Sequence, residues 1–171
     1  MSRRYTLRGE ITIDGAGSIE ERLFSYEAND LSSGWIVRSA QIWDAGRSRA
    51  GGSTTADNNH TMLKLQLQTD TIGANDFFEA NENRAFAWIT ATYAVTDQTP
   101  YNQALVNSDT ILDPDRMIAR ELWGNFTFEA GGGQEAQSKT IGYLIILEKK
   151  KTSPAENILQ QVKSVAQDIN N

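Results

Sequence analysis

Strict alternation of apolar and polar residues recurs along this chain, and it restricts the possible folds more than any other feature. In the segment 61–69 every second side chain is apolar: Leu63, Leu65 and Leu67 alternate with Lys64, Gln66 and Gln68. Successive side chains of a strand point to opposite faces of a sheet. The pattern therefore predicts a strand with the leucines inward and the polar residues outward. Residues 5–13 alternate in the same way, with Ile11 and Ile13 inward.

Further segments have the β-branched and aromatic composition that is typical of strands. The predicted strands are 5–13, 21–27, 34–44, 61–69, 84–96, 116–129 and 140–149, where 116–129 is either two strands or one strand bent at Gly124. Helix-length amphipathic segments do not alternate with these strands, which argues against a parallel βαβ architecture. The sequence thus predicts an all-β chain built as an antiparallel β-sandwich.

Two polar loops separate the predicted strands. The first covers 44–60 and is rich in glycine, and the second covers 96–115. Long crossing loops are typical of Greek-key and jelly-roll sandwiches, so we predict a single jelly roll. A short helix is expected at 74–80. Loops of this length often bind something, and we expect 44–60 and 96–115 to contribute to contacts between subunits.

The strand at 34–44 is predicted to be buried on both faces. Trp35, Val37 and Trp43 would share one face, and Ile36, Ala40 and Ile42 the other. We expect all four tryptophans, which include Trp88 and Trp123, to pack in the core, because each lies within a strand pattern.

The C-terminal part of the chain departs from the β pattern. Ser153 to Glu156 form a capping box with Pro154 at the first helical position, which predicts a helix over 154–169. An apolar stripe recurs at helical spacing: Ile158, Leu159, Val162, Val165, Ala166 and Ile169. A helix this short needs a surface to pack on, either its own sandwich or a neighbouring subunit. We predict a sandwich domain at 1–151 and a helical arm at 152–171, joined by a charged hinge at 148–151.

Composition limits the partners of this chain. The net charge is -6, which disfavours general binding to phosphate backbones, and the basic cluster at Arg3, Arg4 and Arg8 is short. Direct contact with nucleic acid is therefore expected to be minor at most. The absence of cysteine removes disulfides and thiolate sites. No apolar run is long enough to predict a signal peptide or a membrane span.

Residues able to support chemistry are sparse. His60 is the one histidine, in a polar loop, and we expect it to be solvated. Loop carboxylates at Asp109, Asp113 and Asp115 could hold calcium, although Asp113 to Asp115 also fits a turn around Pro114. Other acidic residues are Asp70, Asp76, Glu79 and Glu82. No catalytic residue, cofactor or metal site is predicted. An enzyme on a jelly-roll scaffold would need carboxylates that converge near His60 or 109–115.

Three stretches resemble the single jelly-roll capsid and virion structural proteins of small non-tailed viruses. They are 82–93, 113–128 and 142–169, which together cover less than half of the chain. The resemblance implies a structural viral protein, located in the virion, that assembles as a homo-oligomer or with other virion proteins. The predicted subunit interface is the helical stripe: Ile158, Leu159, Val162, Val165 and Ile169. The alternative is a carbohydrate-binding sandwich, with or without calcium, which would present two coplanar exposed tryptophans.

Overall fold

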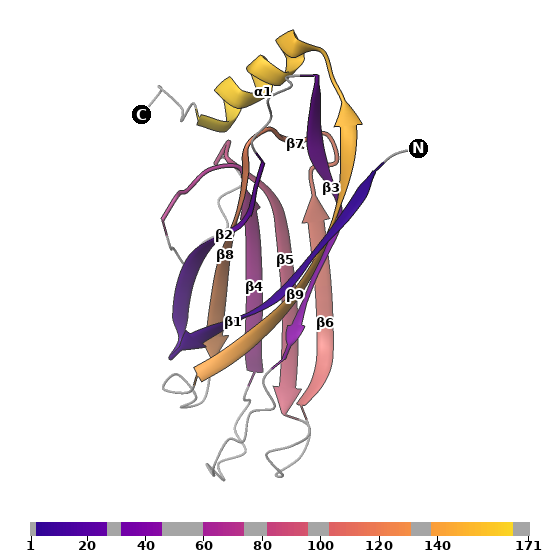
Figure 1. Ribbon diagram of the computed structural model, residues 1–171. Helices are drawn as coiled ribbons and strands as arrows, with labels where there is room; N and C mark the ends of the chain where they lie inside the picture. Colours follow the sequence, from indigo (N-terminus) through magenta and orange to yellow (C-terminus); the bar gives the residue numbers. More distant parts are fainter. Residues whose placement is uncertain are drawn as a thin grey trace.

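The computed structural model describes residues 3–26, 32–45, 60–73, 82–95, 103–130 and 138–165. Within these ranges the chain forms two antiparallel sheets and one helix (Figure 1). The elements are β1 (Arg4–Asp14), β2 (Gly17–Ser25), β3 (Ser33–Asp44), β4 (His60–Gln68), β5 (Ala85–Val95), β6 (Gln103–Leu112), β7 (Met117–Ile118), β8 (Glu121–Ala130), β9 (Ser138–Lys151) and α1 (Pro154–Val165). The predicted all-β sandwich with a C-terminal helix is confirmed.

The order of the strands is that of a jelly roll. One sheet runs β1-β9-β3-β7 and the other runs β2-β8-β4-β5-β6. The pairs β4·β5, β3·β7, β2·β8 and β1·β9 are nested in the sequence, as in one long antiparallel ribbon wrapped into two layers. This wrapping is the jelly-roll topology. Strand β6 is an addition to it, since it extends the larger sheet at one edge.

The core lies between the two sheets and follows the predicted alternation. Leu63, Leu65 and Leu67 are fully buried in it, and Ile11 and Ile13 reach it from β1. The polar side chains of β4 point to the outer face as predicted. Gln66 and Gln68 are nevertheless buried there, so an outward position in this sheet does not imply contact with solvent.

A bulge in β3 corrects the prediction for the faces of this strand. Val37 pairs with Leu147 and Ser39 pairs with Ile146, so that Arg38 is an extra residue. An extra residue inverts the alternation beyond it. Trp35 and Val37 therefore share the core with Ala40 and Ile42. Trp43 was predicted to lie with Trp35, but it points outward and is 40% exposed.

Two further boundaries differ from the prediction. The segment 96–115 is not all loop, because β6 occupies half of it and contains Asp109. The segment 116–129 is two strands, but the break falls at 119–120, and Gly124 lies inside β8. A β-carbon on Gly124 would approach the side chains of Leu23 and Phe126 within 3 Å. This glycine therefore permits close packing between strands rather than a bend.

The start of β4 and the end of β9 also differ from the sequence analysis. His60 was placed in the 44–60 loop, but it is the first residue of β4 and pairs with Ala94. The predicted hinge at 148–151 is part of β9, where Lys151 still pairs with Ser33 of β3. Backbone pairing with β3 keeps residues 148–151 in the sheet despite their charge. The predicted helix at 74–80 and all of the first loop except residues 44, 45 and 60 lie outside the described residues.

Candidate assembly surfaces

Helix α1 begins as the sequence predicted. The backbone N–H of Glu156 donates to the Ser153 hydroxyl at 3.2 Å. The carboxylate of Glu156 turns back, but it accepts from the hydroxyl of Thr152 at 2.7 Å. The bond to Ser153 satisfies a backbone N–H that the first helical turn leaves open. The start of the helix is thus defined by a short local network next to the end of β9.

Polar groups attach α1 to the sandwich. Asn157 is fully buried, and its Nδ2 donates to the carbonyl of Ser33 at 3.0 Å. Gln161 Nε2 donates to Asn157 Oδ1 at 2.9 Å, and the N–H of Thr152 donates to the carbonyl of Ser32. Figure 1 shows α1 across the end of the sandwich where β3 and β9 meet it. The face that contacts the sandwich is therefore polar.

The apolar stripe of α1 points away from the chain's own sandwich. Ile158, Leu159 and Val162 are 50%, 53% and 58% exposed. The side chain of Val165 and all of Ile169 lie outside the described part of the chain. Burying large aliphatic side chains is favourable by about 1.5–3 kcal/mol each. The exposed stripe is thus the surface of α1 that would gain most from a partner.

One side of the sandwich is open between the two sheets. Strand β7 pairs with β3 at only two positions, Trp35 and Ile36. Beyond them, no strand of the described chain pairs with that edge of β3, and none pairs with the outer edge of β6. A hollow of about 720 Å³ lies between residues 38–43 of β3 and the strand β6.

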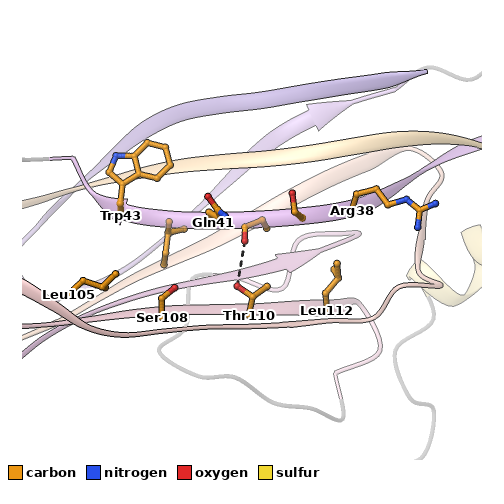
Figure 2. Close-up of a pocket in the computed structure, with 10 residues that line it drawn as sticks. Arg38, Gln41, Trp43, Leu105, Ser108, Thr110 and Leu112 are labelled. Atoms are coloured by element: carbon orange, nitrogen blue, oxygen red, sulfur yellow. Dashed lines mark hydrogen bonds between the residues drawn. The ribbon is translucent and has the colours of Figure 1, made fainter. Parts of the chain in front are cut away.

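Residues of both strands line the hollow. Figure 2 shows Thr110 and Leu112 pointing from β6 toward β3, while Trp43 points away from β6. The Thr110 hydroxyl donates to the carbonyl of Ala40 at 3.5 Å. Leu105 and Ile111 of β6 are 54% and 60% exposed. An open strand edge with exposed aliphatic residues is suited to pairing with another strand.

The Glu20 carboxylate organises the segment that follows β4. It accepts hydrogen bonds from the backbone N–H groups of Ile72 and Gly73 at 2.7 and 3.0 Å. It also accepts from the Thr71 hydroxyl and from Gln68 Nε2. Charge-assisted bonds to backbone N–H groups are stronger than neutral ones. This single side chain of β2 therefore holds residues 71–73 against the edge of the larger sheet.

Replacing Glu20 with alanine is expected to release this segment. The loss of these partly exposed hydrogen bonds to a charged group should cost about 1–3 kcal/mol. It should also speed amide hydrogen exchange at Ile72 and Gly73. Glu10→Ala removes an equal charge from an exposed position of β1 and is the control. Unchanged exchange at both amides in the Glu20 variant would show that the carboxylate does not order them.

Two arginines lie close to this segment. Arg84 donates to both carboxylate oxygens of Glu82 and to the carbonyl of Thr71. The hydrogen bond that Arg84 donates to Glu82 raises the pKa of Arg84, whereas burial lowers the pKa of Arg116 against the opposing effect of Asp113. Both groups remain charged at neutral pH. They tie the loops at this end of the sandwich together through carbonyls and carboxylates.

The predicted acidic cluster does not converge on a cation site within the described residues. Asp109 lies in β6 and accepts from the N–H of Thr110. Asp113 accepts from the N–H of Asp115 at 3.0 Å, which is the turn that Pro114 suggested. No group of three or more His, Asp or Glu residues could hold a metal in the described ranges. Asp76 and Glu79 lie outside them.

The tryptophans do not form an exposed pair on the described surface. Trp35 packs edge-on against Tyr5, Phe24 and Tyr26 in the core. Trp43 is the exposed one, and its indole covers Gly142 of β9. Trp88 and Trp123 are half-buried, and Trp123 Nε1 donates to Glu121 at 2.9 Å. The predicted core role holds for Trp35 and is wrong for Trp43, because of the bulge in β3. It is also wrong for Trp88 and Trp123, which lie opposite Gln66 and Gln68 on the outer face of the larger sheet.

In the part of the chain that the structure describes, no helix is both long enough and apolar enough to cross a membrane. No protein-family model matches the sequence. No curated protein matches it either.

Comparison with solved structures finds VP1 of the Trichodysplasia spinulosa-associated polyomavirus. One VP1 structure has a TM-score of 0.39 and 10% identity, and the match covers 86% of this chain and 96% of that chain. Another, VP1 in complex with sialylated precision glycooligomers, has a TM-score of 0.34 and 12% identity, with 85% and 94% covered. The assignment of this chain to the jelly-roll fold rests on its strand order.

Proposed function

We propose that this protein is a non-enzymatic structural protein that assembles through repeated contacts between subunits, in a virion or a similar shell. The observation that carries the proposal is the orientation of α1. A polar face seats the helix on its own sandwich through Asn157, while Ile158, Leu159 and Val162 face outward. A helix that needed its stripe for its own fold would present the opposite arrangement.

Burial of the α1 stripe by a neighbouring subunit would be energetically favourable. Three aliphatic side chains that are half exposed leave apolar area in water, and a neighbouring subunit could bury it. A specific interface needs about 1,000 Å² or more, so the stripe would form one part of a larger contact. Repetition of that contact by symmetry is what builds closed assemblies from identical chains.

The alternative, a carbohydrate-binding sandwich, would stack sugars on paired aromatic faces. Among the described residues Trp43 is the one tryptophan with an exposed side chain, and it has no coplanar partner there. No specific observation favours that function over assembly.

The test is to make the stripe polar without touching the anchor. Leu159→Asp combined with Val162→Asp should leave folding intact, since both side chains are exposed, and should abolish assembly of the purified protein. Light scattering with negative-stain imaging measures the particle mass against the 19.0 kDa chain. A matched control is Gln161→Ala, which changes the anchored face of the same helix.

Deletion of 153–171 should have the same effect, a folded chain that no longer assembles. Unfolding of that truncated chain would show that the helix belongs to the core of its own subunit. Wild-type protein that stays at 19.0 kDa at high concentration, with no partner protein present, would count against assembly from identical chains.

A further inference from the structure

We infer that β6 is a second self-assembly surface, on which the β6 strands of two copies pair antiparallel about a two-fold axis. This inference rests on the proposed self-assembly and adds a contact to it that is separate from α1. It begins with the place of β6, which lies outside the eight nested strands and forms the edge of the five-stranded sheet.

The chemistry of an open strand edge specifies its partner. Along β6, every second backbone N–H and C=O points outward, and no strand of the described chain pairs with them. Such groups are satisfied by another extended strand. A helix or a compact ligand cannot match their spacing. The partner of this edge is therefore a strand.

From Asn107 to Leu112 this edge lacks the usual protection against pairing. Natural edge strands are shortened, charged, bulged or interrupted by proline. Strand β6 is ten residues long, carries Asp109 as its single charge and contains no proline. It has one bulge, at Val106, and residues 107–112 beyond the bulge pair regularly with β5. Leu105 and Ile111 are more than half exposed on it. A partner strand would cover both, together with the mouth of the hollow in Figure 2.

A second copy of the same strand fits the edge. An antiparallel strand can pair with itself about a two-fold axis, so each copy gives and receives the same contact. In β6, Asn107 and Asp109 lie on the outer face of the sheet, opposite Thr92 and Thr90 of β5, while Ser108 faces the hollow. A register with Ser108 opposite itself places each Asp109 opposite an Asn107. The carboxylate then meets an amide, not a second carboxylate.

A single introduced cysteine tests the contact, because the chain has none of its own. Ser108→Cys should form a disulfide-linked dimer on mild oxidation, since Ser108 is exposed and lies at the axis. Thr6→Cys is the matched control on β1, an exposed position of the edge strand of the other sheet. Equal yields of dimer from the two variants would overturn the inference.

A charge swap tests whether two copies meet at this position. Ser108→Lys and Ser108→Glu should each lose the dimer, since like charges would face each other across the axis. An equimolar mixture of the two should restore it. Dimers in either variant alone, or none in the mixture, would also overturn the inference.

The same cysteine separates this contact from the one through α1. A chain that carries Ser108→Cys together with Leu159→Asp and Val162→Asp should still form disulfide-linked dimers, but no larger assembly. Large assemblies in which Ser108→Cys stays reduced would overturn the β6 contact and leave the proposed function standing. Wild-type protein that forms β6 dimers and no larger species would overturn the proposed function and leave the β6 contact standing.

Discussion

Replacing Lys139 with methionine is expected to lower the free energy of unfolding by about 3–5 kcal/mol. Lys139 pairs with Asp44, and their side chains are only 4% and 12% exposed. Removal of the lysine leaves the mostly buried Asp44 carboxylate without its ion-pair partner, and breaking a buried ion pair on one side is costly. Urea denaturation followed by tryptophan fluorescence measures the change.

Two further variants make the test specific. Lys139→Met with Asp44→Leu replaces both charges by apolar groups and should recover most of the stability, since a buried ion pair is often no better than an apolar one. Arg38→Met breaks the pair with Glu148, in which the arginine is half exposed, and should cost about 1 kcal/mol or less. If the Lys139 and Arg38 variants lose equal stability, the Lys139–Asp44 pair is not buried in solution.

Trp35→Ala is expected to destabilise the protein by about 3–5 kcal/mol, because it opens a cavity in the core. Trp35 is held among Tyr5, Phe24 and Tyr26. Trp43→Ala should cost about 1 kcal/mol or less, since that side chain lies on the surface of the smaller sheet. The contrast arises from the bulge at Arg38, which places the two indoles on opposite faces of β3.

Trp35→Phe refines this comparison. The indole N–H of Trp35 is buried and has no hydrogen-bond partner among the residues that the structure describes. Phenylalanine therefore removes an unsatisfied donor along with some volume. We expect it to lose much less stability than Trp35→Ala. Equal losses for Trp35→Ala and Trp43→Ala would place both side chains in the core and contradict the register of β3 and β9.

Local physics explains which elements the sequence predicted. The period of two in 61–69 and 5–13 predicted β4 and β1, because burial of one face dictates it. The capping box predicted the start of α1, since its hydrogen bonds involve residues close in the sequence. The sandwich followed from the number of strands and the lack of helices between them.

Strand β6 was missed because its sequence lacks that period. Residues 103–112 mix polar and apolar side chains, since an edge strand at an open side has little buried surface to impose alternation. The one signal for it was the run of β-forming residues around 104–106 and 110–112. A long polar loop was therefore the natural interpretation of 96–115.

The charged run at 148–151 was misinterpreted for a related reason. Its composition suggests a solvated hinge, yet β3 supplies backbone partners as far as Lys151. Backbone hydrogen bonds do not depend on which side chains the paired residues carry, so the sequence gives no clear signal that a charged segment ends a strand. The same pairing brings α1 to Ser33, where Asn157 is seated.

The sequence by itself determined most of the strands, the inward faces of β1 and β4 and the amphipathic C-terminal helix. Each of these follows from short-range periodicity and capping chemistry. Tertiary structure alone decided the position of the bulge in β3, the pairing of Lys139 with Asp44, the open side beside β6 and the outward direction of the α1 stripe. These depend on which strand lies beside which, and on residues distant in the chain, such as Ser33 and Asn157, that meet only once the sheets have formed.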